Sequence, residues 1–196
     1  MAAVIRMATG ADGAQAAAIY APSVESAAVS FELEAPTADE MRARIVSTLE
    51  GHPWLVCERD GEMLGYAYAC AHRTRVAYQW CTETSVYISP RARRAGVGGA
   101  LYTALLEILP LQNFYAAYAG ITLPNAASIG LHESMGFELI GVYRNAGFKL
   151  GRWHDVGWWQ YALQPLSNPA APLPLAAVAA GALQDCLDRG TVRLAG

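Results

Sequence analysis

The segment from residue 91 to residue 99 combines charges and backbone groups suited to binding an anion. It reads Arg91-Ala92-Arg93-Arg94-Ala95-Gly96-Val97-Gly98-Gly99, and it lies between a strand-like stretch, 84–89, and a helix-like stretch, 100–109. Free N–H groups and the positive end of the dipole meet at the start of a helix, and glycines let a ligand approach that backbone. The segment predicts a phosphate or pyrophosphate site, with a Gly-rich turn as the simpler alternative. It matches neither a Walker A loop nor a dinucleotide-binding fingerprint.

Two side chains are candidates for proton transfer. Glu83 lies in a strand-like stretch of Thr, Ser, Val, Tyr and Ile residues. A partly buried carboxylate near a ligand can act as a base, directly or through a water, whereas a solvent-facing glutamate is the alternative. His132 can give or take a proton near neutral pH, and its alternative is a hydrogen-bonded helix histidine.

Helices are predicted from capping patterns and breakers. Asp12-x-x-Gln15 predicts a capped helix that Pro22 interrupts, with a second short helix from about Ser23. Thr37-x-x-Glu40 predicts a helix that runs to about residue 50. Further helices are expected over 100–109, ended by Pro110, and over 125–135, ended by Gly136.

Strands are predicted from alternation and turn residues. A first strand covers 4–8, and an Asp60-Gly61 turn joins strands over 54–58 and 63–71 into a hairpin. Later strands are expected over 80–89, 114–122, 139–148 and 155–163. The order of strands and helices predicts an α/β (α+β mixed) fold, in which helices cover a mixed sheet.

Composition limits the class of protein. The chain has 196 residues, of which 54% are hydrophobic, enough for one well-filled core. A net charge of −3 gives no general field for nucleic acid. Four cysteines without a C-x-x-C pair predict buried free thiols, and four histidines without i, i+4 spacing predict no metal site.

Location and domain boundaries follow from the two ends of the chain. The N-terminus lacks the pattern of a signal peptide, and the apolar stretch 173–183 is too short for a membrane span, so a cytoplasmic protein without membrane contact is expected. The composition changes after residue 164. We expect a domain over 1–164 and a Pro/Ala-rich extension over 165–196 with one short amphipathic helix, to which no function is assigned.

Several ordered segments together resemble a known family. Arg93-x-x-Gly96-x-Gly98 resembles the pyrophosphate loop of the GNAT acetyltransferases, and the helix from Asn125 to Gly136-Phe137 resembles a second element of that superfamily. Other segments narrow the similarity to the phosphinothricin N-acetyltransferases, which acetylate small amino acid analogues such as phosphinothricin or methionine sulfoximine. These segments are Tyr78-Gln79-Trp80, Glu83-x-Ser85-Val86-Tyr87, Leu131-His132-Glu133 and Trp153-His154-Asp155-Val156-Gly157. The similarity covers residues 5–163.

The resemblance implies a GNAT-like, mostly antiparallel mixed sheet and acetyl-CoA as the co-substrate. It implies Glu83 as the base and places His132 where many GNAT enzymes have a Tyr that protonates the CoA thiolate. The implied cofactor-binding residues are Val86, Tyr87, Ile88, Arg93, Arg94, Ala95, Gly96, Val97, Gly98, Gly99, Asn125 and Ser128. Val86, Tyr87 and Ile88 would act through their backbone, and a backbone N–H there would polarise the thioester carbonyl.

The implied acceptor is a small-molecule amine, and the implied mechanism is direct transfer in a ternary complex. The acceptor-binding candidates are Phe31, Arg73, Arg75, Tyr78, Gly120 and Val156. Arg75 is the candidate partner for a substrate carboxylate, with an exposed loop arginine as the alternative. The chain departs from the herbicide-detoxifying enzymes, which have a basic residue at the position of Glu32 and Lys at that of Arg73.

Three further expectations remain open at this stage. Peptide or protein amines are an alternative acceptor class, and a non-catalytic acetyl-CoA-binding sensor is an alternative of another kind. The family tends to form homodimers, so a homodimer is expected. Trp158 and Trp159 are interpreted as packing or interface residues.

Overall fold

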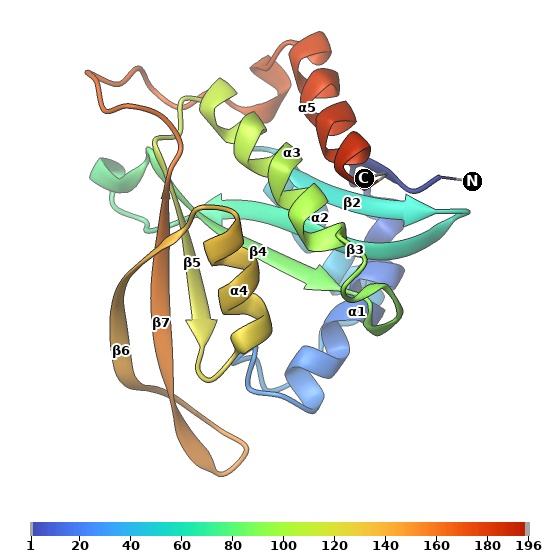
Figure 1. The fold of residues 1–196 in the computed structure, drawn as a ribbon, viewed down its shortest axis with the longest axis vertical. Helices are drawn as coiled ribbons and strands as arrows, with labels where there is room; N and C mark the ends of the chain where they lie inside the picture. The colour runs from blue at the N-terminus through green and yellow to red at the C-terminus, as the bar shows by residue number, and fades with distance from the viewer. Residues whose placement is uncertain (1, 195–196) are drawn as a thin grey trace.

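The computed structural model describes residues 2–194, which contain a seven-stranded sheet in the order β1-β2-β3-β4-β5-β7-β6 (Figure 1). The strands are β1 (Val4–Met7), β2 (Trp54–Arg59), β3 (Glu62–Ala71), β4 (Cys81–Ile88), β5 (Ala116–Thr122), β6 (Glu138–Lys149) and β7 (Arg152–Ala162). Every neighbouring pair is antiparallel except β4 and β5. The predicted mixed, mostly antiparallel sheet is confirmed.

Helices cover both faces of this sheet (Figure 1). They are α1 (Gly13–Glu25), α2 (Ala38–Leu49), α3 (Val97–Leu111), α4 (Ala126–Ser134) and α5 (Ala180–Arg193). On one face, α1 and α2 bury a cluster that includes Tyr20, Ile45 and Tyr66. On the other face, α3 and α5 bury a larger cluster, which includes Leu105 and Leu187 and against which α4 also packs. The sheet therefore separates two apolar cores.

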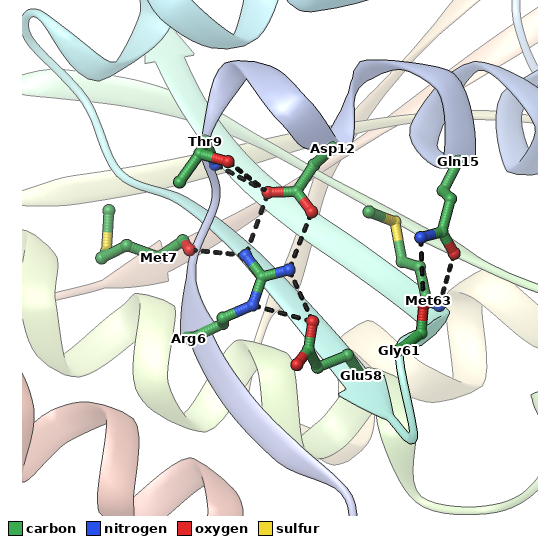
Figure 2. Close-up of polar contacts among 8 residues, drawn as sticks. All are labelled: Arg6, Met7, Thr9, Asp12, Gln15, Glu58, Gly61 and Met63. Atoms are coloured by element: carbon green, nitrogen blue, oxygen red, sulfur yellow. Dashed lines mark hydrogen bonds and ion pairs between the residues drawn. The ribbon is translucent and has the colours of Figure 1, made fainter.

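The predicted break of the first helix at Pro22 is wrong. α1 runs through Pro22 to Glu25, and Val24 beyond the proline is 1% exposed. A proline removes one helical hydrogen bond, but the burial of the last turn offsets that loss. The predicted cap is also wrong, because Asp12 accepts from Thr9 N at 2.7 Å, while Gln15 bonds to the β2–β3 turn (Figure 2).

The start of α2 and the β2–β3 turn form as their local sequences predict. The Thr37–Glu40 capping box of α2 is present, with reciprocal bonds of 3.2 and 2.8 Å. Asp60 and Gly61 have φ values of 54° and 79°, as a two-residue hairpin turn requires. The predicted end of α3 at Pro110 is wrong, since the helix continues to Leu111, and the turn before the proline buries Leu106, Ile108 and Leu109.

Arg6 joins the beginning of the chain to the second strand (Figure 2). Its guanidinium contacts both Asp12 carboxylate oxygens at 2.8 and 2.9 Å and Glu58 Oε2 at 2.6 Å. Burial alone would raise the pKa of Asp12, but the hydrogen bonds from Arg6 and Thr9 outweigh it and hold that pKa below its ordinary value. The cluster fixes β1, β2 and the start of α1 relative to one another.

The C-terminal residues pack onto the sheet instead of extending away from it. Ile5 N donates to Thr191 Oγ1 at 2.9 Å, and Cys186 of α5 is buried beside α3. All four cysteines are free thiols, but Cys70 and Cys81 are only half-buried, contrary to the prediction of burial. Across residues 2–194, no helix is long and apolar enough to cross a membrane. The boundary at residue 164 remains a prediction.

Candidate active site

The sheet opens between β4 and β5 (Figure 1). The two strands pair at only three positions, and the last of these joins Glu83 to Tyr118. Beyond Glu83, β4 remains paired with β3, and Ser89 N donates to Leu64 O at 2.9 Å. Because antiparallel pairing alternates, the backbone of Tyr87 points to β3, whereas the backbone groups of Val86 and Ile88 point into the opening. Two of the three predicted backbone contacts are therefore available to a ligand.

The predicted phosphate loop leads into α3 at the same end of the sheet. Gly96 is the N-cap of α3 with a φ of 75°, and Val97 in the first turn is buried. A Cβ at Gly98 would lie 2.9 Å from a methyl group of Leu131 in α4, so the glycine lets the two helices approach without a shift of that side chain. Arg93 and Arg94 are exposed beside this turn. The free N–H groups of the turn fit a pyrophosphate.

Asn125 and Ser128 form the beginning of α4. Asn125 Oδ1 accepts a hydrogen bond from Ser128 N at 3.1 Å, which is the expected N-cap contact. Both side chains are half-buried, and the contacts predicted for Asn125, Ser128, Ala95 and Gly99 with acetyl-CoA remain predictions.

His132 is buried between α4 and α3, and both of its ring nitrogens are bonded within the protein. Nδ1 lies 2.7 Å from Ser128 O, and because a carbonyl only accepts, Nδ1 carries the hydrogen. Nε2 therefore accepts from the Tyr102 hydroxyl at 2.8 Å. Burial lowers the pKa of His132, so the ring is neutral at neutral pH.

Glu83 lies on the other face of β4. Successive side chains of a strand point to opposite faces. Thr84 contacts Tyr102 of α3, whereas Tyr87, four residues after Glu83, packs on Tyr20 of α1. Glu83 shares the α1 side with Tyr87, so the sheet does not bring the two predicted proton-transfer residues together. The predicted roles of Glu83 and His132 remain predictions.

The carboxylate of Glu83 is bound by two neighbours. Its Oε1 accepts from Arg73 Nη1 at 2.7 Å and lies 3.0 Å from His72 Nδ1. The Arg73 guanidinium also lies over the Trp158 ring, 5.4 Å from its centroid. The predicted acceptor residue Arg73 is thus held by a carboxylate and an aromatic ring.

A cleft of about 260 Å³ opens beside this group. Its lining residues are His72, Arg73, Tyr118, Ile140, Gly141, Tyr143 and Trp158. Of the six predicted acceptor residues, only Arg73 is in this set. Trp158, interpreted from the sequence as a packing or interface residue, also lines the cleft. Sequence reasoning missed His72, for which the one available clue was its position next to Arg73.

Three other predicted acceptor residues lie around the cleft or beside the opening. Tyr78 meets the His72 ring edge-on, with centroids 5.9 Å apart. Gly120 of β5 packs against the Trp158 ring. Val156 is paired with Thr122 and with Tyr143, on the two strands that flank β7.

The remaining two acceptor candidates lie in segments outside the sheet. Arg75 precedes a 3-10 turn and is exposed, and no ion pair to it is found within residues 2–194. Phe31, in the loop after α1, has its ring 6.3 Å from that of His154. Buried Lys149 holds this loop, since its Nζ donates to Ser30 O at 2.7 Å and Glu32 O at 2.8 Å. Within the described residues, no group of three or more His, Cys, Asp or Glu side chains is arranged around a metal position.

Comparison with known proteins agrees with this geometry. The family described as the acetyltransferase (GNAT) domain matches residues 5–158. The chain therefore belongs to the GNAT acetyltransferases and is an acyltransferase.

Relatives place the chain more narrowly within the family. It is 41% identical to a phosphinothricin N-acetyltransferase of Streptomyces viridochromogenes, over 87% of this chain and 92% of the relative. It is 33% identical to an L-methionine sulfoximine/L-methionine sulfone acetyltransferase of Salmonella typhimurium, over 85% of this chain and 98% of the relative.

A solved structure shares both the fold and the co-substrate. A phosphinothricin acetyltransferase from Sinorhizobium meliloti in complex with acetyl-CoA superposes with a TM-score of 0.79 at 36% identity, covering 86% of this chain and 96% of that one. With the cradle formed by the β4–β5 opening and the α3 turn, this confirms the prediction of acetyl-CoA as the co-substrate.

Proposed function

We propose that this protein transfers the acetyl group of acetyl-CoA to the amino group of a small amino acid analogue of the phosphinothricin or methionine sulfoximine type. The observation that carries the proposal is that the cleft lined by His72 and Arg73 lies next to the opening between β4 and β5. The acceptor cleft, with Glu83 at its edge, adjoins the opening between β4 and β5 at its narrow end. The relatives named above support the acceptor class.

The proposed reaction is a direct transfer in a ternary complex. Acetyl-CoA, when bound, supplies the thioester that the amine attacks. Glu83 promotes removal of the amine proton, and the N–H groups of Val86 and Ile88 stabilise negative charge on the carbonyl oxygen. The role predicted for His132, assistance of the leaving thiolate, would require this ring to give up one of its two hydrogen bonds within the protein.

Acceptor recognition is proposed for residues at the rim of the cleft. Arg73 is already paired with Glu83, so it orients the carboxylate and leaves Arg75 as the partner for an acceptor carboxylate. Phe31, Tyr78, Gly120 and Val156 would shape the pocket around the rest of the molecule. An Arg75→Gln variant should raise the KM of the acceptor and leave that of acetyl-CoA unchanged.

The test is release of free CoA with a panel of acceptors. The panel comprises phosphinothricin, methionine sulfoximine, methionine sulfone, ordinary amino acids, polyamines and a basic peptide. Turnover confined to the first three supports the proposal. Binding of acetyl-CoA without any turnover would refute it and favour a sensor.

A peptide or protein amine is the second candidate acceptor. A structure named ribosomal-protein-alanine N-acetyltransferase, from Brucella melitensis, is 34% identical to this chain with a TM-score of 0.78. Faster turnover of the peptide than of the amino acid analogues would favour this candidate.

We also propose a homodimer formed along β6, within the cytoplasm. β6 pairs with β7 on one side only and exposes apolar side chains, among them Leu139, Ile140, Tyr143 and Phe148. Such an edge strand is suited to a second copy of the chain. Sedimentation of the wild type and of Ile140→Lys tests this, and a monomeric wild type would refute it.

A further inference from the structure

We propose that His72 and Glu83 act as a dyad, in which His72 Nε2 takes the proton from the acceptor's ammonium group and Glu83 holds the imidazole. The inference rests on the proposed function, because it names the atom that receives the amine proton.

His72 lies at the point where β4 and β5 separate. Its ring stacks on Tyr118, with centroids 4.4 Å apart and planes at 18°, and its Nδ1 lies 3.0 Å from Glu83 Oε1. Glu83 and Tyr118 are the last pair before the opening. His72 thus contacts both residues of that pair and also lines the acceptor cleft.

The hydrogen-bond pattern leaves one basic nitrogen free. An ionised carboxylate only accepts, so the 3.0 Å contact places the hydrogen on Nδ1 and leaves a lone pair on Nε2. Within residues 2–194, no hydrogen bond to His72 Nε2 is found, and 12% of the side chain is exposed. A carboxylate-bound imidazole with a free Nε2 is the arrangement of a general base.

Glu83 is less well placed to take the proton itself. The contacts of Arg73 Nη1 at 2.7 Å and His72 Nδ1 at 3.0 Å are both made to its Oε1, and the residues that line the cleft include His72 but not Glu83. The same two contacts hold the carboxylate where it can stabilise an imidazolium. The geometry therefore favours Glu83 as the orienting group and His72 as the proton acceptor.

The ammonium group loses one proton to His72 Nε2, which becomes an imidazolium paired with Glu83. The freed nitrogen forms a C–N bond to the acetyl carbon as the C–S bond breaks. The second proton of the nitrogen passes to the departing thiolate, which leaves as the CoA thiol, and the imidazolium returns its proton to solvent.

Several charged or titratable side chains surround His72 and Glu83, and they bear on how activity depends on pH. The charged or titratable neighbours are Arg73, Glu83, Tyr118 and Tyr78, with Cys70 behind Glu83 and Cys81 beside Tyr118. Burial raises the pKa of Cys70 to about 11 and also raises those of Cys81 and Tyr118. These three groups stay protonated near neutral pH, so they place no further charge beside the dyad.

Two substitutions separate a base from a positioning residue. In His72→Asn, the side-chain amide keeps a donor near the position of Nδ1 but cannot take up a proton. In His72→Phe, the ring keeps its stacking on Tyr118 but loses both nitrogens. We expect both variants to lose about 10²-fold or more in kcat, while the Kd for acetyl-CoA is unchanged. The loss should shrink at alkaline pH, where the acceptor amine loses its proton to solvent.

Two results would overturn the dyad. Activity of His72→Asn within about threefold of wild type would show that His72 only positions Glu83. A loss that is the same at every pH would show a structural role.

A measurement without turnover separates failure of the dyad from failure of the proposed function. In ¹⁵N-labelled wild type, the His72 resonances, assigned by their loss in His72→Asn, should show a protonated Nδ1 and a bare Nε2 above neutral pH. The opposite tautomer overturns the dyad. A wild type with the expected tautomer that acetylates no acceptor refutes the proposed function instead.

Discussion

His72 and His132 lie on opposite faces of the same sheet and differ in what binds their nitrogens. His132 is buried, with one nitrogen on Ser128 O and the other on the Tyr102 hydroxyl. His72 is bound through Nδ1 alone, and its ring borders a cleft. A fully bonded histidine contributes order between α3 and α4, whereas a histidine with a free nitrogen beside a cleft can exchange a proton. The comparison shows that the hydrogen bonds of the two ring nitrogens are a better guide to proton exchange than the position of a histidine in a motif.

The largest effect is expected at Glu83, whose carboxylate binds Nδ1 of His72 beside the cleft. Glu83→Gln keeps the shape of the side chain but removes the charge that Arg73 and His72 bind. We expect kcat to fall by about 10²–10³-fold, with acetyl-CoA binding intact by calorimetry. Steady-state CoA release measures the change. A loss below about fivefold would contradict a part for the Glu83 carboxylate in removal of the amine proton, whether direct or through His72.

For stability, unlike activity, the larger effect is expected at His132 and the smaller one at His72. His132→Phe removes the buried hydrogen bonds of the ring to the Tyr102 hydroxyl and to Ser128 O, so we expect the free energy of unfolding to fall by about 2–4 kcal/mol. His72→Phe should cost less than about 1 kcal/mol, because its hydrogen bond is at the edge of solvent. Urea unfolding of both variants measures this. Equal losses would break the comparison.

The pH dependence of unfolding gives a further check on His132. Burial lowers its folded pKa, so the folded state favours the neutral ring. This contribution to stability is present above the ordinary histidine pKa of about 6.5 and is lost as the pH falls through the lower folded value. Wild type should therefore lose stability below about pH 6.5, and His132→Phe should lack that part of the decline.

Asp12 extends the comparison to a carboxylate that is as fully bound as His132. Its folded pKa is held low, so its stabilisation is present above the ordinary carboxyl value and is lost as the pH falls through the folded value. We expect Asp12→Asn to destabilise the protein by about 1–3 kcal/mol at neutral pH, with the difference vanishing in acid. The exposed Asp185→Asn serves as the control. A difference that persists in acid would contradict the ion-pair explanation.

The smallest effect is expected where α3 and α4 approach each other. The Cβ in Gly98→Ala meets a methyl group of Leu131, so that side chain or the first turn of α3 must shift. We expect the KM for acetyl-CoA to rise by about threefold to tenfold with little change in kcat. Leu131→Ala in the same chain should reverse the effect. Gly130→Ala, whose Cβ has nothing within 4 Å, is the matched control.

Local chemistry accounts for the parts of the fold that sequence reasoning predicted. The Thr37 capping box and the Asp60-Gly61 turn are decided within four residues, and the phosphate loop follows from glycines at the start of a helix. The helices containing Pro22 and Pro110 were mispredicted because burial by distant residues offsets the lost hydrogen bond.

The candidate site also has features that the sequence determined and features that only the tertiary structure decided. The sequence by itself determined the family, the order of strands and helices, the loop before α3 and the candidate residues Glu83 and His132. Only the tertiary structure decided that these two lie on opposite faces and that His72 meets Glu83 beside Tyr118. The reason is physical: strand register and side-chain alternation fix which residues meet, and both depend on pairing between segments far apart in the chain.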